Sequence, residues 1–526
     1  MAGNVGWSVV VLPLLAGAGL SFLVESLLRP RILAFWKRQS ATLLIHIGLW
    51  LLLFAFELAV FRRPWFATII ALAFLLVVVQ VSNAKFYSLR EPFVFQDFEY
   101  FTDALKYPRL YLPFLGVGRA LIIAIGFGVA LYAGLTLEPS LTHQVSTAEF
   151  FIMVFVLLII GATLLGLGAR QKLKVTFDPK TDLQQLGLMA SLWRYGEEEY
   201  DNQSVPSLYD FLEPAPLAPE ALPNLVVVQS ESFFDARELF SGIRQEVLRE
   251  FDSLKASAVC QGQVEVSAWG ANTVRTEFAF LSGLASKLLG VHRFNPYRKL
   301  ARQGIPTLAG FLKRLGYRTV CVHPYQAGFY ARDTVFPLLG FDEFIDIKSF
   351  NGIKKTGPYI GDVALAEKVC TLLEASSTQP IFVFVITMEN HGPLHLEKVQ
   401  EGDVERLYSN PPPDECDDLT IYLRHLSNAD RMAGMLRNRL ETLPGNSWLC
   451  WYGDHVPIMP KVYGKMGVPE GQTDYFIWEK GASFGKENRL DIKIENMGCL
   501  LLQKMGLLSI LIKNNSNMPV ETCNLD

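Results

Sequence analysis

The chain has 526 residues, of which 50% are hydrophobic and only 19% are charged, and its formal net charge is −4. Soluble globular proteins carry about 25% charged residues. This composition therefore excludes a fully soluble protein, and it also excludes the disordered, collagenous and coiled-coil classes. The weak negative charge and the lack of a basic stripe with interleaved aromatic residues argue against nucleic acid as a partner.

The charge deficit is concentrated in the first third of the chain. A helix needs about 20 mostly apolar residues to cross the hydrocarbon core of a bilayer, and five segments meet this requirement. They are residues 6–28, 41–61, 65–82, 112–135 and 150–169. We therefore predict an α-helical membrane domain with five transmembrane helices over residues 1–169. An odd number of spans places the two ends of the chain on opposite sides of the membrane.

Basic residues in the loops give conflicting evidence on orientation. The loop 29–38 carries four of them, and three more lie in residues 170–174 after the last span. The positive-inside rule assigns both loops, and with them the C-terminal domain, to the cytoplasm. The turn that contains Arg62 and Arg63 lies on the opposite side and also favours the cytoplasm. Charge counting alone leaves the side of the C-terminal domain open.

Two segments next to the predicted spans mix apolar and polar residues. The loop 83–110 combines Phe and Tyr with five acidic or arginine residues, which is typical of an interfacial amphipathic segment; alternatively, it forms a collar that helps to present a lipid substrate. Residues 170–223 form a predicted connector. It contains one helix near 182–197, and the prolines between 206 and 223 prevent long regular structure after it.

From residue 224 onward the pattern changes to alternating strand and helix signals. Short apolar runs, typical of strands covered on both faces, lie at residues 224–230, 318–324, 381–387 and 447–454. Helical patterns lie between them at residues 273–289, 306–316, 362–375 and 417–443. This alternation predicts an α/β domain with a largely parallel central sheet over residues 224–526.

The seven cysteines are scattered along this domain, at positions 260, 321, 370, 416, 450, 499 and 523. Their number is odd and no two form a CxxC pair, so the sequence does not predict a disulfide framework. We expect free, buried thiols.

Each predicted strand is followed by titratable residues. Ligands of α/β sheets collect beyond the carboxyl ends of the strands, and the residues at these four ends are Glu231, His323, then Glu389, Asn390 and His391, and finally Asp454 and His455. One such residue is usually structural, but four strand ends with the same property indicate a shared site. Carboxylates and imidazoles are ligands for a divalent metal ion.

A nucleophile is predicted at the start of the helical segment 273–289. Residues at a helix N-terminus meet unpaired backbone N–H groups that favour phosphate, and Thr273 beside a divalent cation could ionise and attack phosphorus. Capping of the helix by Asn272 and Thr273 is the structural alternative. Thr276 is the rival nucleophile.

The ordered motifs of the chain resemble those of the lipoteichoic acid synthase family. These motifs are QSESFFD (229–235), GANTVRTEFAFLSGL (270–284), HPYQAGFYARD (323–333), TMENHGP (387–393) and WYGDHVP (451–457). The family consists of membrane-anchored phosphoglycerol transferases of the alkaline phosphatase and sulfatase superfamily. The resemblance implies a sulfatase-like catalytic domain that lies outside the cytoplasmic membrane.

The resemblance also implies a role for individual residues. The metal ligands would be Glu231, Thr273, Asp454 and His455, with Thr273 as the covalent nucleophile. The metal would be divalent, usually manganese in that family, with magnesium or zinc as alternatives. The residues that hold the glycerol phosphate would be His323, Arg332 and His391, and Tyr330 stands where a stacking Trp is common. Tyr325 replaces an acidic residue, so the acceptor contacts of the family do not transfer directly.

The implied reaction has two steps. Thr273 attacks a phosphatidylglycerol-like lipid, and an acceptor hydroxyl of an envelope glycan or glycolipid then regenerates the threonine. In this reaction Arg332 would contact phosphate oxygens and His391 would transfer a proton. A phosphoethanolamine transferase, a phosphodiesterase or sulfatase-like hydrolase, and a non-catalytic membrane scaffold are the alternatives. The sulfatase alternative lacks the Cys/Ser-x-Pro-x-Arg segment that formylglycine requires.

Overall fold

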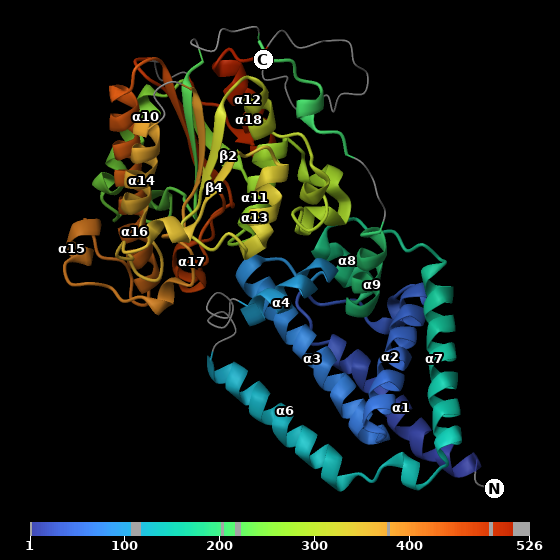
Figure 1. Cartoon of the computed structure of the whole chain (residues 1–526). Coiled ribbons are helices and arrows are strands. Elements are labelled where there is room, and N and C mark those ends of the chain that lie inside the picture. The colour runs from blue at the N-terminus through green and yellow to red at the C-terminus, as the bar shows by residue number, and fades with distance from the viewer. Residues whose placement is uncertain are drawn as a thin grey trace. The chain divides into compact units, whose positions relative to one another are not determined.

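The computed structural model describes residues 3–106, 117–200, 205–215, 222–375, 379–482 and 488–508. The chain forms two compact units, residues 1–202 and residues 203–526. Figure 1 shows the helical first unit in blue to green and the mixed second unit in green to red.

The first unit contains five helices that are long and apolar enough to cross a membrane, counted over the described residues. They are α1 (Gly3–Glu25), α2 (Ser40–Phe61), α3 (Pro64–Leu89), α6 (Val117–Leu137) and α7 (Thr147–Ala169). The five predicted spans are confirmed. Helix α3 continues to Leu89, beyond the predicted end at residue 82, so the first part of the loop 83–110 is helical.

Glycines allow two of these helices to pack closely. A side chain at Gly48 of α2 would lie 2.7 Å from the backbone nitrogen of Leu165 and 2.9 Å from the carbonyl of Gly161, both in α7. Gly168 of α7 is similarly close to the backbone of α2. Small residues at such crossings let two helix backbones approach, which is the usual way that membrane helices associate.

Short helices follow the spans on the polar side of this unit. The loop 83–110 contains a 3₁₀ turn at Phe95–Asp97 and α4 (Phe98–Lys106); its residues 107–110 lie outside the described part. The single helix predicted at 182–197 is wrong, because the chain forms α8 (Pro179–Leu186) and α9 (Leu188–Glu198). Gly187, at φ 78°, separates them by adopting a left-handed conformation that only glycine reaches without strain.

The second unit contains an eight-stranded sheet in the order β4-β3-β5-β1-β6-β7-β2-β8. The four predicted strands form its centre: β3 (Arg318–Val322), β5 (Ile381–Ile386), β1 (Asn224–Ser230) and β6 (Ser447–Gly453), all parallel. The largely parallel sheet is therefore confirmed. Val227 at the middle of β1 pairs with Phe384 on one side and Cys450 on the other.

The remaining four strands were not predicted. They are β2 (Cys260–Glu265), β4 (Glu343–Ile345), β7 (Thr473–Glu479) and β8 (Ile492–Lys493). Strand β7 runs antiparallel to both β6 and β2, and six of its seven residues are buried. Strand β2 alternates buried with more exposed residues, and β4 and β8 have only three and two residues, so a search for continuous apolar runs does not find these three.

Helices cover both faces of the sheet (Figure 1). One apolar core includes side chains of α10 (Arg249–Ser257), α14 (Asp362–Ala375) and α16 (Asp417–Thr442). The other core includes α11 (Thr273–Ser282), α12 (Leu308–Arg314), α13 (Arg332–Leu338) and α18 (Ile494–Lys504). Helix α11 is shorter than predicted, because Gly283 adopts φ 66° and ends it. Two short helices, α15 (Asp403–Leu407) and α17 (Pro460–Met466), complete the unit.

The cysteines differ in one respect from the prediction of free thiols. Cys499 is disulfide-bonded, and the prediction is wrong at this position. The other five cysteines in the described ranges are free; Cys523 lies outside those ranges. A pairing of this kind depends on how close two side chains come in the fold, and scattered single cysteines give no sequence signal for it.

Candidate functional site

Two carboxylates and one imidazole meet at the carboxyl ends of β1 and β6. Glu231, Asp454 and His455 each offer a ligand atom, and these atoms all lie within 4.8 Å of one another. All three side chains are buried. The Nε2 atom of His455 lies 3.4 Å from Asp454 Oδ2 and 3.6 Å from Glu231 Oε1. The predicted metal ligands from these two strand ends are therefore brought together.

The hydrogen bonds around the three residues orient them toward a common point. The Nδ1 atom of His455 bonds to the carbonyl of Val456 at 3.1 Å, so Nδ1 carries the proton and Nε2 is left as the ligand atom. Metal-binding histidines are commonly fixed in this way by a backbone carbonyl. Asp454 Oδ1 accepts from the amide of Ser232 at 2.8 Å, and Oδ2 is buried without a hydrogen-bond partner among the described residues.

The electrostatics of this cluster favour a bound cation. Burial raises the pKa of Glu231, and the negative charge of Asp454 raises it further. Two adjacent buried carboxylates are costly unless a positive charge compensates them. Carboxylate oxygens and one imidazole nitrogen form a ligand set suited to manganese, magnesium or zinc. The residues therefore fit a divalent ion.

Thr273 is the first residue of α11 and its hydroxyl faces the same cluster. Thr273 Oγ1 lies 3.5 Å from Glu231 Oε2. Asn272 precedes it in a left-handed conformation, at φ 68°, and makes no side-chain capping hydrogen bond. The predicted capping role of Asn272 is therefore wrong. Strained backbone of this kind is concentrated at functional sites, and Ser232, which follows Glu231, has the same feature at φ 53°.

The rival nucleophile Thr276 has a different environment. It is completely buried, and its hydroxyl donates to the backbone carbonyl of Asp454 at 2.9 Å. This hydrogen bond ties α11 to the loop after β6. Thr276 therefore supports the loop that carries Asp454, a predicted metal ligand, and of the two threonines only Thr273 directs its hydroxyl at the carboxylate cluster.

Arg332 forms a buried ion pair that the sequence analysis did not foresee. Its Nε lies 3.1 Å from Glu277 Oε1, and one terminal nitrogen lies 2.9 Å from Glu277 Oε2. Burial alone lowers the pKa of Arg332, but the Glu277 carboxylate outweighs it and holds the pKa above its ordinary value. Two of the donors expected to bind phosphate are therefore occupied by protein, and Arg332 is held in one orientation.

The third guanidinium nitrogen of Arg332 faces His323. It lies 3.3 Å from His323 Nε2, and His323 Nδ1 bonds to the carbonyl of Ile386 at 3.1 Å. Burial and the positive charge of Arg332 hold the pKa of His323 well below its usual range, so the ring is neutral at neutral pH. Tyr330 completes this group, with its ring 5.2 Å from the guanidinium carbon of Arg332.

His391 lies in the loop after β5 and is partly exposed. Its Nδ1 bonds to the carbonyl of Gly392 at 2.8 Å and lies 3.3 Å from the hydroxyl of Tyr359. Burial lowers its pKa, so Nε2 of the neutral ring is a proton acceptor. The neighbouring Glu389 instead accepts from the backbone of Asp362 at 2.6 Å and holds the start of α14.

Sequence reasoning missed the residues that support these groups. Glu277, besides holding Arg332, accepts from the Tyr297 hydroxyl at 2.5 Å and lies 3.4 Å from the side-chain amide of Gln229. Ser232 donates to Glu231 at 2.8 Å. For Glu277 the signal is its place in α11, all of whose residues are buried. A fully buried acid requires a partner.

These features define a protein with five candidate membrane spans and an α/β domain that carries a possible metal site at its strand ends. A sequence model of the sulfatase family matches residues 223–492. The capsular polysaccharide biosynthesis protein RkpI of Rhizobium meliloti is 31% identical over 449 residues, which is 81% of this chain and 79% of that protein. The chain belongs to the sulfatase family, and the predicted membership of the alkaline phosphatase and sulfatase superfamily is confirmed.

Solved structures share the architecture. The lipooligosaccharide phosphoethanolamine transferase EptA of Neisseria meningitidis covers 96% of this chain and 95% of its own, with 15% identity and a TM-score of 0.54. This similarity shows the same fold. The phosphoglycerol transferase GacH of Streptococcus pyogenes, in complex with sn-glycerol-1-phosphate, is 22% identical and covers 59% of this chain and 79% of its own, with a TM-score of 0.45.

Proposed function

We propose that the protein is a membrane-bound, metal-dependent phosphoglycerol transferase. It would move glycerol phosphate from a phosphatidylglycerol-like lipid to an envelope glycan or glycolipid through a covalent intermediate on Thr273. The observation that carries the proposal is the convergence of the Thr273 hydroxyl with Glu231, Asp454 and His455 at a helix N-terminus. A hydroxyl, a cation site and free backbone N–H groups together are what phosphoryl transfer requires.

The residues that would hold the divalent ion are Glu231, Thr273, Asp454 and His455. When bound, the ion supplies positive charge that lowers the pKa of a neighbouring hydroxyl and stabilises the charge that develops on phosphate oxygens. The chain supplies the rest. Arg332 is fixed by Glu277 and faces His323 with its third nitrogen, and we propose that these two residues contact phosphate oxygens of the substrate. We propose His391, whose Nδ1 is bonded to the carbonyl of Gly392, as the residue that transfers a proton through Nε2.

In the first step Thr273 Oγ attacks the phosphorus of the lipid phosphodiester. A threonine–phosphorus bond forms, the bond between phosphorus and the diacylglycerol oxygen breaks, and diacylglycerol leaves with a proton. In the second step an acceptor hydroxyl attacks the same phosphorus, loses its proton to the site and releases Thr273. Neutral His391 is the proposed proton carrier: it takes the proton of Thr273 in the first step and, as the imidazolium, passes it to the departing diacylglycerol oxygen. In the second step it takes the proton of the acceptor hydroxyl and returns it to the Thr273 oxygen.

The curated relatives support a glycan as the acceptor. RkpI is named for capsular polysaccharide biosynthesis. A second Rhizobium meliloti protein, a putative cyclic beta-1,2-glucan modification protein, is 27% identical over 262 residues, 49% of this chain and 40% of that protein. Both names concern envelope or secreted glycans. We therefore propose a saccharide hydroxyl as the group that accepts glycerol phosphate.

We also propose that the catalytic domain lies outside the cytoplasmic membrane, where such acceptors are found. One arginine of the loop that argues for the other side has a structural role, since Arg38 is paired with buried Glu25 at 2.7 Å. With the catalytic domain outside, the turn that contains Arg62 and Arg63 faces the cytoplasm, as the positive-inside rule favours.

Mass spectrometry of the purified full-length protein tests the proposal directly. The protein is incubated with manganese and either phosphatidylglycerol or phosphatidylethanolamine, quenched in acid and digested. We expect a phosphoglycerol adduct on the peptide that contains Thr273, and only with phosphatidylglycerol. A phosphoethanolamine adduct on that residue would replace the headgroup assignment with the ethanolamine alternative. An adduct on another residue, or transfer that proceeds fully in Thr273→Ala, would overturn the nucleophile.

A further inference from the structure

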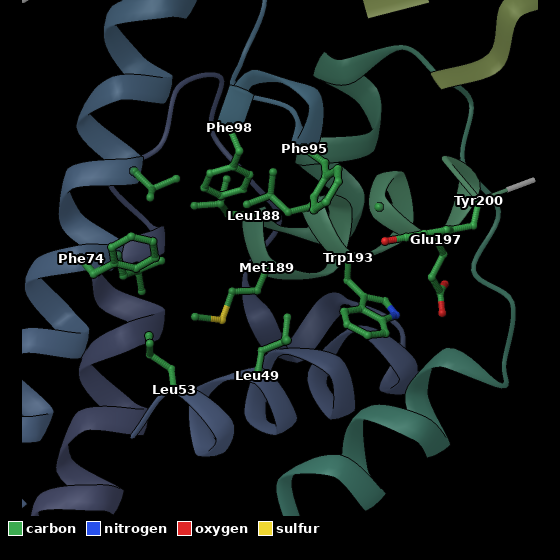
Figure 2. Close-up of a pocket in the computed structure, with 14 residues that line it drawn as sticks. Leu49, Leu53, Phe74, Phe95, Phe98, Leu188, Met189, Trp193, Glu197 and Tyr200 are labelled. Atoms are coloured by element: carbon green, nitrogen blue, oxygen red, sulfur yellow. The ribbon is translucent and has the colours of Figure 1, made fainter. Parts of the chain in front are cut away.

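The membrane unit contains an apolar pocket that is separate from the metal-binding cluster in sequence and chemistry. Its volume is about 640 Å³. Figure 2 shows side chains of α2, α3 and α9 and of the segment 95–98 converging on it. Leu49 and Leu53 contribute from α2, Phe74 from α3, Phe98 from α4, and Met189 from α9. A pocket of this size is typical of a small-molecule site.

The lining of the pocket joins two kinds of helix. On one side are Leu49 and Leu53 of α2 and Phe74 of α3, from helices that are long and apolar enough to cross a membrane. On the other side is α9, whose sequence Leu188–Glu198 places apolar and charged residues on different faces, as interfacial helices do. The pocket is therefore lined by an interfacial helix and by two candidate spans, and the apolar chain of a membrane lipid matches this lining.

The pocket has one polar side. Glu197 and Tyr200 lie together next to Trp193, whereas Leu53 and Phe74 lie away from them (Figure 2). Among the described residues, the indole Nε1 of Trp193 is buried without a hydrogen-bond partner. An indole N–H is a donor only, and a buried donor of this kind is normally satisfied. An ester carbonyl at the headgroup end of an acyl chain would supply the acceptor.

The wall formed by α9 is held in place before any ligand binds. The backbone amides of Leu188 and Met189 both donate to Glu25 Oε1, at 2.8 and 3.2 Å. Glu25 is completely buried, and its other oxygen is bound by Arg38. Because Met189 lines the pocket, this network fixes the pocket in an open form and lowers the conformational cost of binding.

We propose that the pocket binds one acyl chain of a membrane glycerophospholipid, with the ester group next to Trp193. The identity of that lipid as the donor rests on the proposed function, whereas the binding of the chain does not. The pocket would hold the lipid at the level of the interface by its tail, so that the headgroup is left free for chemistry.

Photocrosslinking in lipid nanodiscs tests this site. Full-length protein is reconstituted with phosphatidylglycerol that carries a diazirine in one acyl chain, irradiated, digested and mapped by mass spectrometry. We expect crosslinks concentrated on the pocket segments of α2, α3 and α9. The variant Leu53→Trp, which fills the pocket, should reduce them about tenfold or more, since each methylene kept out of an apolar site costs about fourfold in affinity. The matched variant Val60→Trp, at an exposed position of the same helix, should leave them unchanged.

Additional variants and probes in the same experiment separate lipid binding in the pocket from the proposed reaction. Thr273→Ala should crosslink as the wild type does, since it alters no residue of the pocket. A probe with the same acyl chain on an ethanolamine headgroup should give crosslinks at the same positions. If crosslinks are instead spread evenly over the exposed faces of α1 and α6, or if Leu53→Trp has no effect on them, the site is refuted. Crosslinks in the pocket without any adduct on Thr273 would retain the lipid site and refute the transferase.

Discussion

Each unit of the molecule contains a completely buried carboxylate, and the two differ in how they are satisfied. In the membrane unit, Glu25 accepts from Arg38 at 2.7 Å and from two backbone amides, and His46 Nδ1 lies 3.5 Å away. In the second unit, Asp454 lies beside the carboxylate of Glu231, and its Oδ2 has no hydrogen-bond partner among the described residues.

The difference separates a structural charge from a functional one. A buried acid whose hydrogen bonds are all supplied by the protein needs nothing further, and its network fixes one arrangement of helices. A buried acid that faces another acid, with one oxygen left without a partner, needs a proton or a cation to balance the pair. The unpartnered oxygen beside a second acid, and not burial by itself, therefore distinguishes Asp454 from Glu25.

The largest expected effect is at Thr273, the proposed nucleophile. Thr273→Ala should reduce transfer to a labelled acceptor by about 10⁴-fold or more, because loss of a covalent nucleophile removes the reaction path itself. Metal binding should persist, since Glu231, Asp454 and His455 remain. Transfer is measured with radiolabelled phosphatidylglycerol, and metal content by mass spectrometry. Thr273→Ser keeps a hydroxyl and should retain measurable activity; equal loss in both variants would contradict the assignment.

Asp454→Asn should abolish the metal dependence of stability. In the wild type, manganese should raise the Tm, because a ligand that binds only the folded state stabilises it. The variant should lose most of this increase, while its metal-free Tm rises or stays constant, since one of two facing carboxylates is neutralised. Thermal scans with and without a chelator measure both quantities. A metal-free Tm that falls by many degrees would show that Asp454 is structural, as Glu25 is.

Glu25→Gln should produce the opposite pattern. Removing this charge leaves Arg38 buried without its partner, at a cost of about 3 kcal/mol, and the Tm should fall equally with and without metal. The same scans provide the measurement. Glu246→Gln, which neutralises an exposed carboxylate, is the control and should have little effect. A loss of stability only in the metal-bound form would show that Glu25 takes part in metal binding and would contradict its purely structural role.

The smallest effect is on pH dependence. Burial and the charge of Asp454 raise the pKa of Glu231 above its ordinary value of 4.5 in the folded, metal-free protein. The folded state then holds a proton that the unfolded state has released, so stability should decline as the pH rises through the interval above 4.5 and up to the folded pKa. Chelated protein should show this decline in Tm between about pH 5 and 8. Saturating manganese should remove it, and a metal-free profile that is flat would contradict the pairing.

The elements that were predictable share one property, a strong local pattern. The five spans and the four central strands are continuous apolar runs, and the structure places each close to its predicted range. Glu231, His323 and Asp454 were found because they directly follow such strands. Strand β2, the three-residue strand β4 and the break at Gly187 were missed, since alternating burial, a very short strand and a single glycine give weak signals. Strand β7 was missed although nearly all of its residues are buried.

The supporting residues could not be predicted, because their function depends on contacts that are distant in sequence. Glu277 and Arg332 are 55 residues apart, and nothing near either one indicates that they pair. The network of Glu25 joins α1 to amides that follow it by more than 160 residues. Such partners come together only when the helices and strands pack. Which surfaces then meet depends on the combined preferences of many residues along the whole chain.

The sequence by itself determined the class of the protein: a membrane part made of long apolar helices, and an α/β part whose strand ends carry acids, histidines and a threonine. It did so because hydrophobic periodicity and strand-end chemistry are local properties. Only the tertiary structure decided which threonine faces the carboxylates, that Arg332 is held by Glu277, and that α9 closes an apolar pocket against α2 and α3. These are consequences of which side chains are left without partners once the helices and the sheet have packed.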